Sequence, residues 1–240
     1  MLTLFHVENL PIDIGQHFVI DGDNGHHASR VLRLEQGEEL LLSDGRGSWS
    51  RVTVSAVDKK SVSVTVLETG SQRALSTTIT VIQALTKGDR AKEAVELLTE
   101  AGVDVIIPWQ SSRSIGKAEA GVERLRTTAR ESSKQSRRFW IPEVRDVAST
   151  KDVLATISTS DLALVLHESA LTKISDALAG LTLVSKVAIV VGPEGGLTDE
   201  ELELMHEAGA KIVLLGRPIL RSAHAGIAAV SAVCAALQIW

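Results

Sequence analysis

The residues of this sequence that are best suited to bind a ligand lie in three short segments of its second half. Residues 191–198 read Val-Gly-Pro-Glu-Gly-Gly-Leu-Thr, and residues 215–221 read Leu-Gly-Arg-Pro-Ile-Leu-Arg. Glycines of this kind let the backbone approach a ligand closely or adopt a positive φ, and a proline stiffens the turn. The third segment, residues 166–168, reads Leu-His-Glu. Taken singly, each segment fits a plain connection or a surface pair as well as a binding site.

The residues that follow the first segment limit the kind of ligand it could hold. Thr198 and Glu201 have the spacing of a capping box, so a helix is expected to begin directly after the glycines. Acidic residues are favoured in the first turn by the helix dipole, but Asp199, Glu200 and Glu201 would repel a pyrophosphate there. We therefore expect a neutral or cationic ligand that rests on backbone atoms.

Two other kinds of site are not indicated by the sequence. No G-x-x-x-x-G-K-[ST] or G-x-G-x-x-G string occurs at a strand-to-helix junction, which argues against an ordinary nucleotide-binding sheet. The chain also has no H-E-x-x-H motif and only one cysteine, Cys234. A metal-dependent hydrolase is therefore not expected, and we expect no metal.

Each of the three segments follows a predicted strand in an alternating series of strands and helices. This alternation predicts parallel strands joined by right-handed crossovers, that is, an α/β fold with a mostly parallel sheet flanked by helices. Ligands of such sheets bind at the carboxyl ends of the strands, which is where the three segments lie. The expected strands are 78–85, 103–108, 161–166, 186–191 and 211–215, and the expected helices are 90–101, 121–138, 199–208 and 223–240.

The first third of the chain follows a different pattern. Residues 51–57 and 61–66 alternate polar and apolar side chains with period two, as half-buried strands require. A polar stretch at 70–76 then separates this part from the alternating strands and helices. We expect a small β-barrel or sandwich over 1–72 and an α/β domain over 73–240.

The charged residues are unevenly distributed. The formal net charge is −5, yet residues 110–138 hold eight basic and three acidic residues, a local excess that suits phosphate contact. The first residues lack the pattern of a signal peptide and the single cysteine fits a reducing compartment, so a cytoplasmic location is expected. The last predicted helix is too weakly hydrophobic for a membrane span, and we expect it in the core or at a subunit interface.

Several of these segments together resemble a known family. Residues 191–196 and 215–221 closely resemble the two cofactor loops of the SPOUT methyltransferases. Within that superfamily the chain resembles the bacterial ribosomal RNA small subunit methyltransferase E family, whose members methylate N3 of a uridine in 16S ribosomal RNA. The similarity continues through His27-Ala-Ser-Arg-Val-Leu-Arg33, Gln83-Ala-Leu-Thr-Lys87, and residues 131–138, where Gln135, Ser136 and Arg138 fit the family's pattern.

The resemblance implies a fold, a cofactor and partners. It implies a PUA-like RNA-binding β-barrel over 1–72 and a SPOUT methyltransferase domain with a trefoil knot over 73–240, assembled as a homodimer. It also implies S-adenosylmethionine as cofactor and 16S ribosomal RNA, within the small ribosomal subunit, as partner. The cofactor-binding residues it implies are Leu166, His167, Glu168, Val191, Gly192, Gly195, Gly196, Leu215, Gly216, Ile219 and Leu220, and the RNA-binding residues are Arg30, Arg33, Lys87 and Arg137.

Methylation of uridine N3 requires alignment of the two reactants and removal of a weakly acidic proton. A guanidinium group could stabilise the anion that develops over O2, N3 and O4. Arg138 and Arg221 are the candidates for this role, although Arg138 could equally be a helix-end arginine or a phosphate contact. Gln135 is the candidate for positioning the base. Candidate proton acceptors are His167, His224 and Glu168.

Two short stretches depart from the family's pattern. Residues 220–225 read Leu-Arg-Ser-Ala-His-Ala where members commonly have Leu-Arg-Thr-Glu-Thr-Ala, so a glutamate is absent and His224 replaces a hydroxyl residue. The order of Arg217 and Pro218 is also inverted. These departures keep a second hypothesis open, namely a non-catalytic RNA-binding ribosome-assembly factor with a degenerate cofactor pocket.

Overall fold

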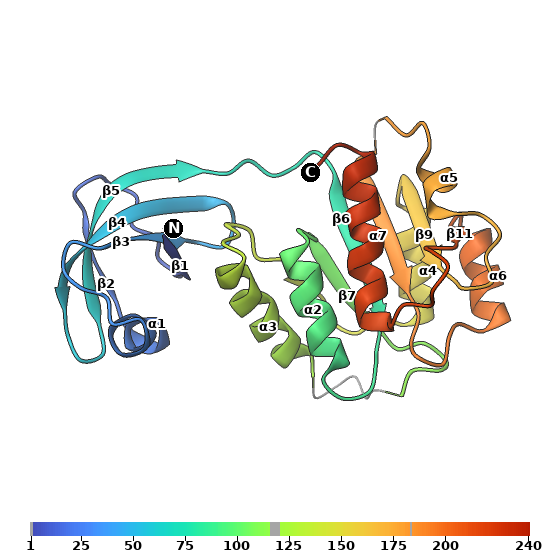
Figure 1. The fold of residues 1–240 in the computed structure, drawn as a ribbon, viewed down its shortest axis with the longest axis horizontal. Coiled ribbons are helices and arrows are strands. Elements are labelled where there is room, and N and C mark those ends of the chain that lie inside the picture. The colour runs from blue at the N-terminus through green and yellow to red at the C-terminus, as the bar shows by residue number, and fades with distance from the viewer. Residues whose placement is uncertain (1, 116–120, 183) are drawn as a thin grey trace. The chain divides into compact units, whose positions relative to one another are not determined.

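The computed structural model describes residues 2–115, 121–182 and 184–240. Contacts among these residues form two compact units, most of whose elements are labelled in Figure 1. The first unit consists of the residues up to Ala74 together with Ser133–Ile141, and the second consists of Leu75–Ser132 together with Pro142–Trp240.

The first unit contains the strands β1 (Thr3–His6), β2 (His17–Ile20), β3 (Glu39–Ser43), β4 (Ser48–Val57) and β5 (Val62–Ser71), the short helix α1 (Gly22–His26) and the π-helical turn η1 (His27–Val31). The strands form one sheet in the order β1-β3-β4-β5-β2. β1 runs parallel to β3, and the other neighbours are antiparallel. The all-β character expected for this part of the chain is therefore present.

The core of the first unit lies on one face of this sheet. The alternation predicted for 51–57 and 61–66 is confirmed, because buried valines in β4 and β5 are separated by residues that are half-buried or exposed. Period-two burial is what a sheet with one solvated face requires. The buried residues of this core are Phe5, Ile20, Ala28, Leu40, Leu42, Val52, Val54, Val62, Val64 and Val66.

A segment from the middle of the chain completes the first unit. The ring of Phe139 stacks on Trp49 with a centroid distance of 5.8 Å, and Trp140 donates its indole N–H to the carbonyl of Gln72 at 3.1 Å. A Cβ at Gly47 would lie 2.5 Å from the Trp140 ring, so only glycine fits there. The boundary expected after residue 72 assigned this segment to the second domain, whereas its contacts lie in the first unit.

The second unit contains the strands β6 (Thr78–Ala84), β7 (Val105–Trp109), β8 (Glu143–Val144), β9 (Leu162–Leu166), β10 (Lys186–Val191) and β11 (Lys211–Val213), and the helices α2 (Arg90–Glu100), α3 (Val122–Gln135), α4 (Thr150–Ser158), α5 (Ile174–Leu178), α6 (Asp199–Glu207) and α7 (Ser222–Ala236). The end of α3 reaches into the first unit. The strand order is β11-β9-β10-β6-β7-β8, and every neighbouring pair is parallel. The predicted α/β fold is confirmed.

Helices cover both faces of the parallel sheet, which explains why its strands are apolar throughout. In β10, Val187, Ile189 and Val191 pack with α2, α3, α5 and α7, whereas Ala188 and Val190 pack with α4 and α6. Figure 1 shows α2, α3 and α7 side by side on one face of the sheet. Among the described residues no helix is both long and apolar enough to cross a membrane.

The helix predicted for 121–138 ends earlier, at Gln135. Arg137 adopts φ 56°, and the backbone N–H of Arg138 donates to the carbonyl of Ser133 at 2.9 Å. This is a Schellman ending, in which a left-handed residue terminates the helix. Such endings usually have glycine at the left-handed position, so an arginine there gave no signal in the sequence.

The strand registers bring the three candidate binding segments to the same edge of the sheet. Val190 lies beside Val165, and Val213 lies beside Leu166. Because the strands are parallel, the segments that follow β9, β10 and β11 all leave at their carboxyl ends. The sheet thus places these segments together, as the sequence predicts.

Candidate active site

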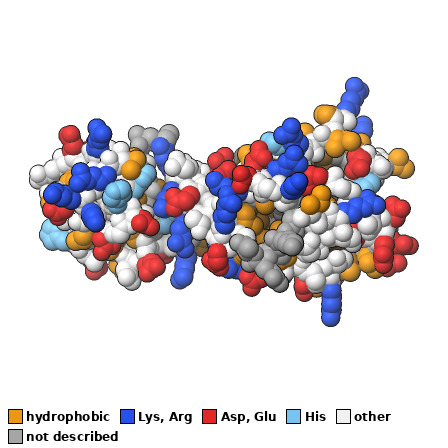
Figure 2. Space-filling model, turned by 90° about the horizontal axis from the view of Figure 1, so that it is seen from below, with side chains coloured by type: hydrophobic (Ala, Val, Ile, Leu, Met, Phe, Trp, Pro, Cys, Tyr) orange, Lys and Arg blue, Asp and Glu red, His pale blue; other side chains and the backbone are white. Residues whose placement is uncertain are grey.

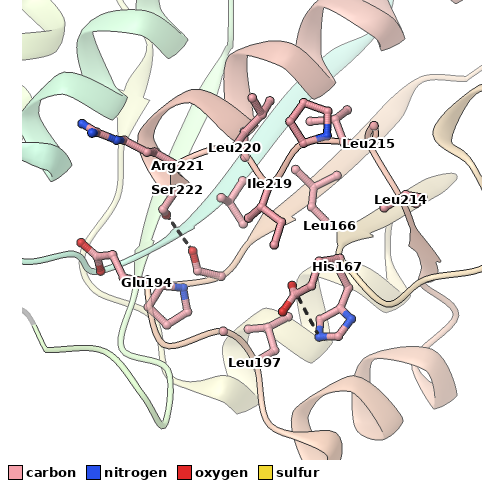
Figure 3. A pocket seen from close by; sticks show the side chains of 18 of the residues that line it. Leu166, His167, Glu194, Leu197, Leu214, Leu215, Ile219, Leu220, Arg221 and Ser222 are labelled. Atoms are coloured by element: carbon pink, nitrogen blue, oxygen red, sulfur yellow. Dashed lines mark hydrogen bonds and ion pairs between the residues drawn. The ribbon is translucent and has the colours of Figure 1, made fainter.

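A cavity of about 550 Å³ opens at this edge of the second unit. It is bounded by the segments after β9, β10 and β11 and by the first turn of α7, as the close view in Figure 3 shows. Its volume is within the range of small-molecule sites. Of the predicted cofactor-binding residues, those that line it are Leu166, His167, Glu168, Val191, Gly192, Gly196, Leu215, Gly216, Ile219 and Leu220.

Gly195 is the predicted cofactor-binding residue that does not line the cavity. Its carbonyl accepts a hydrogen bond from the guanidinium of Arg113 at 3.1 Å, and the same Arg113 nitrogen donates to the carbonyl of Leu197 at 3.2 Å. A Cβ at Gly195 would lie 3.2 Å from the Arg113 Cβ. The absence of a side chain at Gly195 therefore leaves space for Arg113, whose two hydrogen bonds hold the loop after β10 in place.

The wall of the cavity is apolar on one side and charged on the other. In Figure 3 the side chains of Leu166, Ile219 and Leu220 gather near the centre, and Glu194 and Arg221 lie toward one side. A Cβ at Gly192 would lie 3.1 Å from the side chain of Leu197, so glycine keeps the floor of the cavity open. The arrangement suits a ligand with an apolar portion and a polar, charged portion.

Ser222 connects the cavity to the strand beneath it. Its hydroxyl donates to the carbonyl of Gly192 at 2.7 Å and accepts a hydrogen bond from the side-chain amide of Gln83 at 2.8 Å. Gln83 is the penultimate residue of β6, Gly192 follows β10 and Ser222 begins α7. We call these three residues the Ser222 relay. It ties two strand ends and the last helix together where the cavity is formed.

Glu194 connects the glycine loop to the start of α2. Its carboxylate accepts a hydrogen bond from the guanidinium of Arg90 at 2.9 Å. Burial alone would raise the pKa of Glu194, but hydrogen bonds from its own backbone, from Arg90 and from the backbone of Lys87 outweigh burial and lower that pKa. Glu194 is therefore an anion at neutral pH.

The capping box predicted for Thr198 and Glu201 is present. The Thr198 hydroxyl accepts from the backbone N–H of Glu201 at 3.1 Å, and the Glu201 carboxylate accepts from the backbone N–H of Thr198 at 2.9 Å. The same carboxylate also accepts from the backbone N–H of Ser112 at 2.8 Å. Burial would raise the pKa of Glu201, but the hydrogen bonds from Ser112 and Thr198 lower it overall.

Two of the candidate proton acceptors are already engaged. The Nδ1 atom of His167 accepts from the backbone N–H of Ser169 at 3.2 Å, so the proton of the neutral ring is on Nε2, which lies 3.9 Å from Glu168. The lone pair that a general base needs is therefore already in use. The Nε2 atom of His224 lies 3.5 Å from Glu93, outside the cavity lining.

The other predicted site residues lie in different parts of the chain. Arg221 lines the cavity, and Lys87 lies on the exposed segment between β6 and α2. Gln135 lies at the end of α3. The remaining candidates, Arg30, Arg33, Arg137 and Arg138, belong to the first unit.

Two of the predicted RNA-binding arginines have an uncommon backbone conformation. Arg33 has φ 53° and Arg137 has φ 56°, in the left-handed region that residues other than glycine seldom adopt. Arg30 is held differently, because its Nε donates to the carbonyl of Lys59 at 3.1 Å. The conformation of Arg137 belongs to the helix ending described above, and Gln238 has the same conformation, with φ 54°, after α7.

Sequence reasoning missed Arg90, Arg113, Glu194 and Ser222. Each lies next to a segment that was singled out, but none forms a recognisable motif with it. Most of their contacts join residues more than 80 positions apart, for example Arg113 with Leu197 and Arg90 with Glu194, whereas Ser222 also contacts Gly192, 30 positions away. The only available signal was proximity, because Glu194 lies inside the glycine segment and Ser222 directly follows Arg221.

Comparison with known proteins identifies the family of the chain. The family described as RNA methyltransferase domain matches residues 73–234, and the family described as RNA methyltransferase PUA domain matches residues 20–67. A Mycobacterium bovis protein named Ribosomal RNA small subunit methyltransferase E is 37% identical over 246 aligned residues, which cover 99% of this chain and 93% of that protein. The chain belongs to the ribosomal RNA small subunit methyltransferase E family.

Solved structures of methyltransferases have the same fold over nearly the whole chain. Ribosomal RNA small subunit methyltransferase E from Neisseria gonorrhoeae, bound to S-adenosyl methionine, matches with a TM-score of 0.88 and 26% identity, covering 99% of this chain and 98% of that chain. A Legionella pneumophila methyltransferase in complex with bound SAM matches with a TM-score of 0.86 and 27% identity, covering 98% of each chain. The resemblance inferred from the sequence motifs is confirmed.

The cavity of this methyltransferase E family member fits S-adenosylmethionine. A Cβ at Gly192 would come within 3.1 Å of the Leu197 side chain, so only a glycine forms this floor without crowding, and the apolar side chains of Leu166, Ile219 and Leu220 form a wall suited to an adenine ring. Glu194 is an anion on the charged side, where a sulfonium or an ammonium group would be stabilised. No acidic cluster suited to a metal ion occurs among the described residues.

Proposed function

We propose that this protein methylates N3 of a uridine in 16S ribosomal RNA of the small ribosomal subunit, with S-adenosylmethionine as the methyl donor. The observation that carries the proposal is the cavity at the carboxyl ends of β9, β10 and β11, floored by Gly192 and Gly196, in a chain of this family. The backbone around the predicted cofactor-binding residues would hold the donor.

The bound cofactor supplies an electrophilic methyl group on a sulfonium. The residues of this chain orient the donor and exclude water from it. Leu166, Ile219 and Leu220 provide an apolar wall, and the Ser222 relay holds the carbonyl of Gly192 in place. Alignment of this kind is the main contribution that a protein makes to an in-line displacement.

Removal of the uridine N3 proton is the harder task. Arg221 lines the cavity and has no ion pair within the described part of the chain, so its guanidinium is available to stabilise a developing uridine anion. For Arg138 and Gln135 we propose the roles implied by the family pattern, anion stabilisation and positioning of the base. The proton acceptor that best fits the structure is Glu168, because the Nδ1 lone pair of His167 is occupied.

We propose that the β domain over 1–72 binds RNA and that the domain over 73–240 carries the chemistry. Arg30, Arg33, Arg137 and Lys87 would contact RNA phosphates, which position the strand without reading bases. The match of residues 20–67 to a PUA domain supports this division of labour. By analogy with the family, we also propose a homodimer, a trefoil knot in the second unit and action in the cytoplasm.

The alternative is an assembly factor with a degenerate cofactor pocket. Its support was the altered stretch Ser222-Ala-His-Ala. Ser222 retains a hydroxyl at the position where relatives carry threonine, and that hydroxyl is used in the relay. The pocket is therefore built, and the structure favours the enzyme.

The proposal is tested with purified protein, S-adenosylmethionine and unmodified small-subunit particles. Mass spectrometry of the digested RNA should find one uridine methylated at N3. Gly192→Val, which fills the floor of the cavity against Leu197, should abolish both cofactor binding and methylation. Methylation of another base would contradict the proposed reaction, and the absence of methylation on naked RNA and on particles would favour the assembly factor.

A further inference from the structure

A second cavity, of about 540 Å³, lies next to the cofactor cavity in the second unit. We call it the charged groove, because every residue that lines it is ionisable. The groove lies between the segment after β6, the helix α2 and the starts of α3 and α7. Its basic residues are Lys87, Arg90, Lys92, Arg124 and Arg221, and its acidic residues are Asp89, Glu93 and Glu96.

Most of the acidic charge in this groove is already paired. Arg124 lies 2.9 Å from Asp89, and Lys92 lies 3.3 Å from Glu96. Glu93 lies 3.5 Å from the imidazole of His224. Basic and acidic side chains are interspersed over the face drawn in Figure 2.

The remaining positive charge of the groove comes from Lys87, Arg90 and Arg221. Within the described residues neither Lys87 nor Arg221 forms an ion pair, and Arg90 is paired with Glu194, which is outside the groove. The groove therefore presents an excess of positive charge, and an anion would be attracted to it.

Arg90 and Arg221 line both the charged groove and the cofactor cavity. A base that receives a methyl group from the donor must lie at the mouth of the cofactor cavity. The two phosphates that flank this nucleotide in the RNA chain therefore lie close to the same mouth. The two guanidinium groups stand at that junction. A planar guanidinium binds a phosphate through two parallel hydrogen bonds.

The ion pair between Arg90 and Glu194 is suited to exchange. The Glu194 carboxylate also accepts hydrogen bonds from its own backbone and from the backbone of Lys87, so it keeps partners when Arg90 leaves. The side chain of Arg90 is 46% exposed, which lets it turn toward the groove without unpacking the core. The Glu194 side chain is only 25% exposed, so the pair is partly buried, and the remaining hydrogen bonds to Glu194 limit the cost of losing Arg90.

We propose that Lys87 and Arg90 form a subsite for the RNA phosphates beside the methylated nucleotide, and that Arg90 exchanges Glu194 for a phosphate when RNA binds. Arg221 borders this subsite on the side of the cofactor cavity, where it faces the uridine. The inference deepens the proposed function and rests on it. Because Glu194 lines the cofactor cavity, this exchange changes the partner of a residue in the donor site whenever RNA binds.

The test measures binding of a fluorescent fragment of 16S ribosomal RNA by anisotropy, without cofactor, over a range of KCl concentrations. Arg90→Gln should weaken binding and reduce the slope of log Kd against log salt by about 0.7 to 0.9, as the loss of one phosphate contact does. Glu194→Gln should tighten binding about two- to fivefold, because Arg90 is released from its ion pair. Arg90→Lys should keep the salt slope but bind more weakly than wild type, because it loses the bidentate contact.

Arg145→Gln is the matched control, because Arg145 forms an ion pair with Glu143 in the same unit away from the groove. It should leave both the affinity and the slope unchanged. If Arg90→Gln leaves the slope unchanged, or if Glu194→Gln weakens RNA binding as much as Arg90→Gln does, the pair only holds the loop and the subsite is wrong. Failure of the proposed function is recognised separately, as wild-type protein that shows the expected slopes and transfers no methyl group.

Discussion

Ser222 shows how a departure from the family's sequence pattern can preserve a site. Relatives commonly carry threonine where this chain has Ser222, and both residues provide a hydroxyl. That hydroxyl joins Gln83 to the carbonyl of Gly192. The following residue, Ala223, is buried with 1% of its surface exposed, so this chain packs a small side chain where relatives have glutamate.

We predict that Ser222→Ala weakens the binding of S-adenosylmethionine. The substitution removes the shorter of the two hydrogen bonds that the Gln83 amide nitrogen donates, keeping only the one to the Ala84 carbonyl at 3.3 Å, and it removes the hydroxyl donor of the Gly192 carbonyl. The expected cost is about 1–3 kcal/mol. Ser222→Thr should bind the cofactor as wild type does. Isothermal titration calorimetry on the three proteins measures the difference, and equal affinity for Ser222→Ala would show that the relay does not shape the cavity.

We predict that Glu201→Gln lowers stability in a pH-dependent way. The pKa of Glu201 is lowered in the folded protein, so its carboxylate stabilises the fold above the unfolded pKa of about 4.3 and loses this effect as pH falls through the folded pKa. The loss at pH 7 should be about 1–2 kcal/mol, as for other helix caps. Urea unfolding at pH 7 and at acidic pH measures it, and a loss that does not shrink in acid would contradict the assignment.

At the scale of elements, the helices end where local backbone geometry allows it. Gly102 ends α2 with φ 90°, as the sequence predicts, and the N–H of Val103 closes the turn on the carbonyl of Leu98 at 3.1 Å. Arg137 ends α3 in the same way without a glycine. The left-handed ending can therefore be predicted from the sequence for α2, which has a glycine there, but not for α3, which has an arginine.

The packing of α7 against α2 depends on a glycine in the middle of α7. A Cβ at Gly226 would lie 3.0 Å from the side chain of Leu98. We predict that Gly226→Val destabilises the protein by about 1–3 kcal/mol, because the added methyl groups overfill the contact. Thermal unfolding followed by circular dichroism measures this. Ala235→Val, at an exposed position of the same helix, is the control and should have little effect.

At the scale of the whole molecule, the first unit is built from two segments of the chain. Residues 133–141 return to the unit formed by the first 74 residues. This return connects the basic end of α3 to the β-sheet unit, because Lys134 donates to the side chain of Asn24 at 3.2 Å. The proposed RNA-binding residues Arg30, Arg33 and Arg137 thereby belong to one unit.

We predict that Phe139→Ala destabilises the first unit by about 1–3 kcal/mol, through the lost apolar surface and the lost stack on Trp49. Urea unfolding followed by circular dichroism measures the change. Trp240→Ala removes a mostly exposed aromatic residue and should leave stability nearly unchanged. If Phe139→Ala is equally neutral, the returning segment does not stabilise this unit.

The sequence by itself determined that a β domain precedes an α/β domain with a parallel sheet, and that the cavity lies at the carboxyl ends of the strands of this sheet. Residues 187–191 and 162–166 are continuous apolar runs, as strands buried on both faces of a parallel sheet require, and two of the three candidate segments begin where these runs end. The two-residue strand β8 and the five-residue helix α5 were missed because so few residues give little signal. The nine-residue helix α4 was also missed, although Ser149 and Asp152 have the spacing of a cap before it. The family motifs were sufficient to identify the methyltransferase family, because they recur in order along the whole chain.

Only the tertiary structure decided which distant residues meet. The pairing of Arg90 with Glu194, the hydrogen bond from Gln83 to Ser222 and the stacking of Phe139 on Trp49 each join residues about 90 or more positions apart. Local propensity and periodicity depend on neighbours within a few residues, so they carry no information about such contacts. The strand order and the direction of each loop bring these side chains together, and they emerge only when the sheet is assembled.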